Sequence, residues 1–93
     1  MITCVVVLKS ARKQLEKSPM QVQSKFNLWI ASVMEIGVEE MRKFVGCHDE
    51  GLQGDRKGQR SIRLNNKWRA IYVIKNNDLI EFVEVQEITP HEY

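Results

Sequence analysis

The sequence predicts one α+β domain over residues 1–93, with two N-terminal helices packed on one face of a small, twisted, antiparallel-rich sheet. Three features predict this class: a β-branched apolar segment at the start, an apolar stripe of helical period in the middle, and three short extended segments separated by turns at the end. The expected element order is strand, helix, helix and three-strand meander. With 93 residues, 43% hydrophobic and 28% charged, the chain has a globular composition and enough length for one thin core.

The first element is predicted to be a strand. Ile2–Leu8 is apolar and β-branched without helical period, which is typical of a strand buried on both faces and central in its sheet, so Cys4 is expected in the core. The longest apolar run, Val5–Leu8, is far shorter than the roughly 20 residues that cross a bilayer. No signal-peptide pattern opens the sequence. We therefore expect a cytoplasmic protein with no membrane partner.

Two helices are predicted to follow. Ser10 is placed to cap a short helix through about Lys17, and Pro19 favours the first helical position of a second. The second helix carries apolar residues at spacings of three and four: Val22, Phe26, Trp29 or Ile30, Val33 and Ile36. This stripe indicates core packing rather than stacking on a ligand. Gly37 is expected to end the helix, and residues 39–45 to add one more turn.

The C-terminal half is predicted to be a loop and a meander. Residues 46–58 contain four glycines and mixed charge, which is typical of an ordered surface loop. Three strands are expected after it: residues 60–64, 68–75 and 79–88, with turns at 65–67 and 76–78 and a stop at Pro90. Strand alternation places Arg69 on the opposite face from Ala70 and Tyr72, so one face packs on helices and the other displays cations.

Charge is segregated along the chain. Residues 54–69 hold six Lys or Arg and one Asp, for a net charge of +5, whereas residues 70–93 carry −4. Dense positive charge on a short hairpin indicates phosphate binding, and the residues expected to bind RNA are Arg56, Lys57, Arg60 and Lys67. The side chains of Arg56, Lys57 and Arg60 are expected to be solvated. The alternative is a basic edge that only discourages aggregation of the sheet.

No cofactor is expected. The two cysteines do not form a disulfide framework, and Cys47 beside His48 lacks a second pair of metal ligands. The candidate acid–base groups are Glu50 with His48 in the loop, and His91 with Tyr93 at the C-terminus. We therefore expect neither a metal nor a small-molecule cofactor.

Several of these features resemble one family. The run Gly54–Asn65, followed by Trp68–Tyr72, resembles the signature hairpin of the RelE/ParE-superfamily toxins of type II toxin–antitoxin systems, closest to the HigB branch. The loop His48–Leu52 and the tail His91–Tyr93 resemble those of the YoeB-like members, which are ribosome-dependent RNA-cleaving toxins. The resemblance implies a RelE-like fold over residues 1–93.

The resemblance also implies catalytic roles. Cleavage by the RNA's own 2′-hydroxyl needs a base for its proton, a cation for the phosphorane and an acid for the departing 5′-oxygen, and it needs no metal. By similarity to the YoeB-like members, Glu50 matches the base, Arg69 the transition-state arginine and His91 the acid. Arg63 matches a phosphate clamp, and Tyr93 matches a terminal tyrosine that orients the substrate.

Two departures from the family pattern stand out. Members nearest RelE use a lysine pair on the strand that here reads Ser61–Arg63, and an arginine in the last strand where this chain has Glu87. That version of the chemistry is absent. The tail also has Glu92 between His91 and Tyr93, where YoeB-like tails have the two adjacent.

The leading hypothesis is an mRNA interferase, an endoribonuclease toxin that cleaves mRNA in the ribosomal A site and halts translation. The alternative is a ParE-like toxin that inhibits DNA gyrase without catalysis, and a third hypothesis is a catalytically silent remnant that binds only an antitoxin. Glu50, His91 and Tyr93 discriminate, since a gyrase inhibitor needs no acid–base set. Both toxin hypotheses imply a cognate antitoxin, partly acidic where it covers Arg63 and Arg69. The first also implies the ribosome and mRNA as partners.

Overall fold

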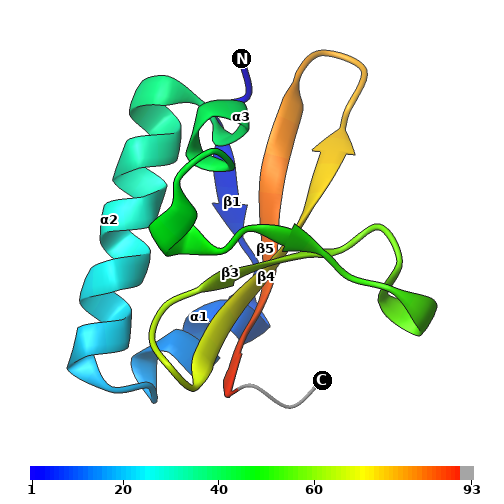
Figure 1. The fold of residues 1–93 in the computed structure, drawn as a ribbon. Helices are drawn as coiled ribbons and strands as arrows, with labels where there is room; N and C mark the ends of the chain where they lie inside the picture. The colour runs from blue at the N-terminus through cyan, green and yellow to red at the C-terminus, as the bar shows by residue number, and fades with distance from the viewer. Residues whose placement is uncertain (91–93) are drawn as a thin grey trace.

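The computed structural model describes residues 1–90 and shows a mixed sheet with helices on one side (Figure 1). The helices and strands are β1 (Val5–Val7), α1 (Lys9–Glu16), α2 (Met20–Ile36), α3 (Val38–Met41), β2 (Glu50–Gly51), β3 (Arg60–Arg63), β4 (Trp68–Asn76) and β5 (Glu81–Pro90). The strand order is β1-β5-β4-β3-β2, with β1 parallel to β5 and the other neighbours antiparallel. The predicted fold class and the three-strand meander are confirmed.

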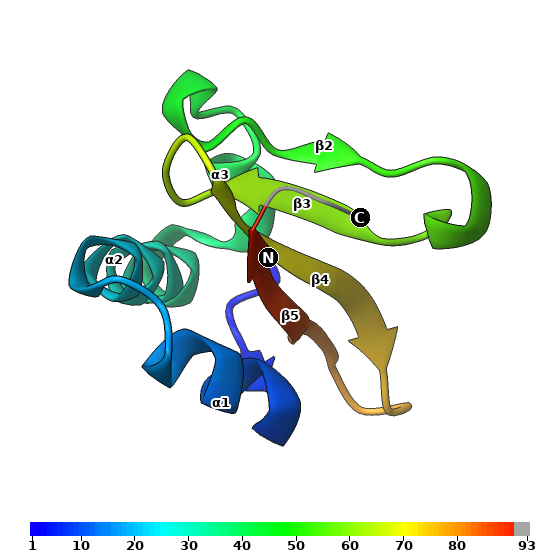
Figure 2. The same ribbon diagram turned by 90° about the horizontal axis from the view of Figure 1, so that it is seen from below.

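The helices lie on one side of the sheet (Figure 2), and α2 buries its apolar stripe against that face. Val22, Phe26, Trp29 and Val33 of α2 are buried with Ala11 of α1 and with residues of β3, β4 and β5. The Trp29 ring centroid lies 6.2 Å from that of Phe26 and 5.4 Å from that of Tyr72 on β4. Burying such aromatic side chains contributes about 1.5–3 kcal/mol each. The stripe is therefore core, as its spacing predicts.

The predicted central position of the first strand is wrong. β1 has three residues, lies at the edge of the sheet and, within residues 1–90, pairs with β5 alone. Val5 and Val7 pack against the core, but Val6 is 41% exposed and Cys4 is exposed, so the expectation that Cys4 is a core residue is also wrong. An apolar run alone does not distinguish a central strand from an edge strand with one covered face. Here α1 begins two residues after β1, so the chain leaves the sheet early.

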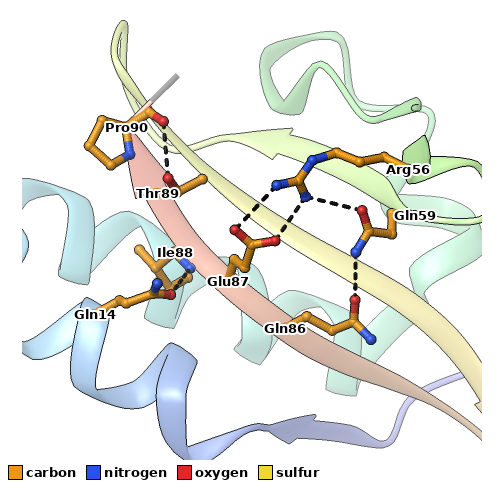
Figure 3. A network of polar contacts seen from close by, with 8 residues as sticks. All are labelled: Gln14, Arg56, Gln59, Gln86, Glu87, Ile88, Thr89 and Pro90. Carbon is orange, nitrogen blue, oxygen red and sulfur yellow. Dashed lines mark hydrogen bonds and ion pairs between the residues drawn. The ribbon is translucent and has the colours of Figure 1, made fainter. Parts of the chain in front are cut away.

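Two local expectations also change. Ser10 lies inside α1 and does not cap it, because the helix begins at Lys9 after Leu8. β5 runs on to Pro90, which pairs with Trp68, rather than stopping before it. Where β1 has already ended, the amide of Ile88 in β5 donates to Gln14 Oε1 of α1 at 2.8 Å (Figure 3). The Gln14 side chain thus accepts the hydrogen bond that a neighbouring strand would otherwise accept. Pro90, at the end of the same edge of β5, interrupts no hydrogen bonds between strands.

Gly37 ends α2, as predicted, with a φ of 89° that favours glycine. The loop after α3 contains β2, which pairs with β3 and extends the sheet by one short strand that the sequence analysis does not anticipate. Two residues form β2, and period-two alternation cannot be recognised over so short a segment.

Candidate functional site

Strand pairing arranges the face away from the helices into two rows of side chains. Arg63 of β3 is directly opposite Arg69 of β4, which in turn is opposite Thr89 of β5. The neighbouring row is Glu50, Ser61, Ile71 and Glu87, on β2, β3, β4 and β5 in turn. Like charges directly opposite each other destabilise a sheet, so the Arg63–Arg69 pair indicates a place for an anion. The predicted location of Arg69 on this face is confirmed.

Arg69 is held in place by the turn between β3 and β4. Its Nη1 donates to the carbonyl oxygen of Asn65 at 2.8 Å and to that of Trp68 at 3.0 Å. Asn65 Oδ1 accepts from the amides of Lys67 and Trp68, at 2.8 Å each, and so closes the turn. Arg69 is only 8% exposed and forms no ion pair with a carboxylate in the described part of the chain. Its guanidinium is oriented by neutral carbonyls, and its charge stays available to a ligand.

Arg63 contacts the loop that leads into β2. Its Nη1 lies 3.2 Å from Nε2 of His48, which must be the acceptor because a guanidinium only donates. Within residues 1–90, the buried Nε of Arg63 has no hydrogen-bond partner. His48 is exposed and adopts a left-handed conformation with a φ of 47°. Glu50 lies exposed two residues on and pairs with Ser61, one row from Arg63.

The structure therefore brings three of the predicted catalytic residues, Glu50, Arg63 and Arg69, onto one face. The other two, His91 and Tyr93, lie outside the described residues.

A buried carboxylate holds the loop that carries His48 and Glu50. The Asp49 side chain is completely buried and accepts from Arg60 Nε and from the Tyr72 hydroxyl, both at 2.6 Å. The Tyr72 hydroxyl in turn accepts from Arg42 Nε at 3.3 Å. Asp49 and Arg42 are not among the functional residues that the sequence predicts.

Two of the four predicted RNA-binding residues have internal partners. Arg56 forms an ion pair with Glu87 of β5 at 2.8 Å and also donates to Gln59, while Gln59 donates to Gln86 (Figure 3). Arg60 pairs with Asp49 and lies on the helix side of β3, in register with Tyr72. The expectation that both arginines are solvated is wrong, because nearby carboxylates neutralise them.

Lys57 and Lys67 remain exposed and form no ion pair within residues 1–90. Lys57 therefore agrees with the expected solvation, and Lys67, the fourth member of the predicted RNA-binding set, is exposed as well.

The Arg56 loop crosses the open face of the sheet. Arg56 and Gln59 reach β5 although β4 lies between β3 and β5, so their side chains pass over β4. Ile71 of β4, the strand partner of Glu87, is fully buried although it faces away from the helices. The cross-strand contacts thus lie over the row of Glu87. In the neighbouring row Arg63 is half-buried and Arg69 is buried.

Burial raises the pKa of Tyr72 to about 12 from its ordinary value of 10, and the hydrogen bond to the Asp49 carboxylate adds to this rise. The folded-state pKa is above the unfolded one, so this group stabilises the fold fully below pH 10 and progressively less up to pH 12. We expect the free energy of unfolding to fall by about 2–3 kcal/mol across that window. Urea unfolding at stepped pH measures the loss, and absorbance titration follows tyrosinate formation.

Tyr72→Phe is the matched control for this pH dependence, because it keeps the ring and removes the ionising group. An equally steep loss of stability in Tyr72→Phe between pH 10 and pH 12 would contradict the assignment.

Residues 1–90 contain no group of three or more His, Cys, Asp or Glu side chains placed to hold a metal ion. Among these residues, no helix combines the length and the apolar character needed to span a membrane.

Comparison with known proteins identifies the fold. No protein-family model and no curated protein matches the sequence. Among solved structures, a YoeB/ParE toxin from Agrobacterium tumefaciens is 20% identical, with a TM-score of 0.72 over 96% of this chain and 99% of that one. The toxin–antitoxin complex RelBE2 from Mycobacterium tuberculosis contains a chain that is 20% identical, with a TM-score of 0.56 over 98% of this chain and 100% of that one.

A third similar structure is the YoeB–YefM complex from Staphylococcus aureus, which is 18% identical with a TM-score of 0.68 over 95% of each chain. The similarity extends over nearly the whole of both chains in each case, and the mostly antiparallel sheet with helices on one face is common to them. The chain therefore has the fold of the YoeB-, ParE- and RelE-type toxins, as the hairpin and loop motifs predict.

Proposed function

We propose that this protein is the toxin of a toxin–antitoxin system and acts as a ribosome-dependent mRNA endoribonuclease. The observation that carries the proposal is the paired Arg63 and Arg69 on the open face, with the Glu50 carboxylate in the next row. Arg69 is oriented by two carbonyl oxygens and has no carboxylate partner within residues 1–90, which suits a cation that stabilises developing negative charge. The toxin fold supports the same assignment.

In the proposed reaction, the groups that form and break bonds belong to the RNA and to side chains of this chain. Glu50 takes the proton of a 2′-hydroxyl, whose oxygen attacks the adjacent phosphorus. Arg69 stabilises the phosphorane, and Arg63 holds a non-bridging oxygen. The P–O5′ bond then breaks, with His91 giving its proton to the departing oxygen and Tyr93 orienting the substrate. The products are a 2′,3′-cyclic phosphate and a free 5′-hydroxyl, so neither a metal nor a cofactor is required.

We propose a cognate antitoxin as the main protein partner. Two of the similar structures are complexes of a toxin with its antitoxin, YoeB–YefM and RelBE2. In this chain an acidic antitoxin segment over Arg63 and Arg69 would neutralise the uncompensated charge and cover the site. The cytoplasm, where translating ribosomes and message are present, is the compartment in which this activity would operate.

A translation extract with a defined message tests the proposal. Wild-type protein is expected to cut the message on translating ribosomes, with primer extension locating the new 5′ ends. Parallel reactions contain the message without ribosomes, and DNA gyrase with relaxed plasmid and ATP. An intact message on translating ribosomes together with inhibition of gyrase supercoiling would replace the nuclease with the ParE-like alternative.

Lys57 and Lys67 provide a test of RNA binding that avoids the internal ion pairs. We expect Lys57→Gln with Lys67→Gln to weaken ribosome or RNA association and to reduce the slope of log affinity against log salt by about one per lost phosphate contact. Folding is expected to change little, because both side chains are exposed. Filter binding at several salt concentrations measures the slope.

The matched control for this pair is Lys9→Gln with Lys13→Gln, which removes the same charge from exposed positions on α1. If both double variants lose affinity and slope equally, the effect reflects net charge alone, and the two lysines are not specific contacts.

A further inference from the structure

A second cation-lined site lies on the other side of β3 from Arg63 and Arg69. A pocket of about 300 Å³ is lined by Arg42, Gly51, Gly58, Arg60 and Ile74, among others. Arg60 is in register with Tyr72, whose side chain belongs to the helix-facing core, so the pocket opens on the helix side of the sheet. It is therefore separate from the two rows on the open face.

The two arginines of this pocket share one carboxylate. Arg60 Nε donates to Asp49, and Arg42 Nε donates to the Tyr72 hydroxyl, which itself donates to Asp49. Tyr72 is neutral near pH 7, so the cluster of two guanidiniums and one carboxylate carries a net charge of +1. Within residues 1–90, Asp49 is the one carboxylate that forms an ion pair with either arginine. Two partly desolvated guanidiniums that share one carboxylate keep one positive charge uncompensated, and a second anion would balance it.

The shape of the pocket suits a small oxyanion. Gly51 and Gly58 line it without side chains, and Arg60 Nη1 lies 3.5 Å from where a Cβ on Gly51 would stand. A guanidinium offers a planar fork of donors that matches phosphate oxygens, and two such forks suit a tetrahedral group better than a planar carboxylate. One phosphodiester carries a single negative charge, which would balance the net charge of +1 on the Arg42, Arg60 and Asp49 cluster. Lys57, beside Gly58, is exposed and adds positive charge near the entrance.

We propose that the Arg42–Arg60 pocket is a second anion site, which binds a backbone phosphate of RNA on the helix side of β3. The site needs no catalysis, so it stands apart from the proposed cleavage. It also gives Arg60, which is not on the open face, a phosphate contact of its own. Inorganic phosphate presents the same chemistry and is the simplest probe.

Phosphate titration of the wild-type protein tests the site directly. At constant ionic strength, inorganic phosphate is expected to shift the amide resonances of Gly51 and Gly58 saturably, in ¹H–¹⁵N spectra. Arg42→Gln is expected to weaken this binding at least tenfold, while Arg12→Gln, a matched exposed arginine on α1, leaves it unchanged. Because Arg42→Gln loses a hydrogen bond to Tyr72, the wild-type shifts keep the test valid even if that variant unfolds. Shifts confined to residues around Arg63 and Arg69 would overturn the proposal.

A short RNA made resistant to cleavage by 2′-O-methyl groups separates the two phosphate sources. We expect it to shift the same glycine amides, and its salt slope to fall by about one in Arg42→Gln. If inorganic phosphate binds but the RNA leaves the Gly51 and Gly58 resonances unmoved, the assignment to an RNA backbone phosphate is wrong. Equal RNA affinity and equal salt slope in Arg42→Gln and Arg12→Gln would also show that the assignment to an RNA backbone phosphate is wrong.

Discussion

Arg69→Ala is expected to lower the rate of mRNA cleavage by about a hundredfold or more and to abolish toxicity. Removing one preorganised donor at developing negative charge typically costs about 2.7–4 kcal/mol of transition-state stabilisation. The donor is preorganised here because the carbonyl oxygens of Asn65 and Trp68 hold the guanidinium within a closed turn. Primer extension in a translation extract measures the rate, and binding to the antitoxin reports that the variant is folded.

Two variants sharpen this test of the site. Lys75→Ala removes a cation from an exposed position on the same strand and is expected to cleave normally. Arg69→Lys keeps the charge but loses the planar fork, so it is expected to recover only part of the rate. Cleavage by Arg69→Ala at the wild-type rate would show that the site is misplaced.

Substitutions of the two proposed acid–base residues are expected to lower the cleavage rate to different degrees. His91→Ala is expected to abolish detectable cleavage, because the positioned acid that protonates the departing 5′-oxygen is lost and water protonates it far more slowly. Glu50→Gln is expected to cause a smaller loss, since it lies in the row beside Arg63 and Arg69 rather than within it.

The face of Arg69 could be predicted from sequence because alternation along a nine-residue strand is a strong constraint. Along β4, Trp68–Asn76, a shift of one residue in the pairing register would turn Ala70 and Tyr72 away from the core. Both side chains are fully buried, so only one register fits. The α2 stripe was predictable for the same reason, since helical period over 17 residues leaves one choice of buried face. Long periodic elements therefore account for the part of the fold that the sequence predicts correctly.

Contacts between distant segments account for the rest. The Arg56–Glu87 ion pair joins residues 31 positions apart, and Asp49 meets Tyr72 across 23 positions. Neither contact produces a pattern within a short stretch of sequence. The composition therefore indicates only a basic segment and an acidic tail, not which of their residues pair. The edge position of β1 also depends on distant segments, because it is set by the order in which the strands of the whole sheet pair. The catalytic candidates on the open face come from motif resemblance. Asp49 lies in the resembling loop His48–Leu52, but the resemblance assigns it no role, and Arg42 lies outside every resembling segment.

Asp49→Ala is expected to cause the largest loss of stability of any substitution considered, about 2–4 kcal/mol in the free energy of unfolding. Its completely buried carboxylate accepts two short hydrogen bonds, one from a guanidinium that is 31% exposed. Removing one partner of a buried charged pair costs about 3–5 kcal/mol, and the partial exposure of Arg60 reduces this. A loss of about 3 kcal/mol corresponds to a melting temperature lower by about 12–24 °C for a domain of this size. Urea and thermal unfolding measure both quantities.

Asp55→Ala is the matched control, since it removes an exposed carboxylate from the same loop and is expected to cost less than about 0.5 kcal/mol. Equal stability of the two variants would show that the Asp49 network contributes nothing. Asp49→Asn separates charge from shape, because an amide oxygen still accepts from Tyr72 while the attraction to Arg60 is lost. The loss should then be intermediate. Below the melting temperature of Asp49→Asn, its cleavage rate should still fall, because His48 and Glu50 flank this residue and depend on its anchoring to face Arg63.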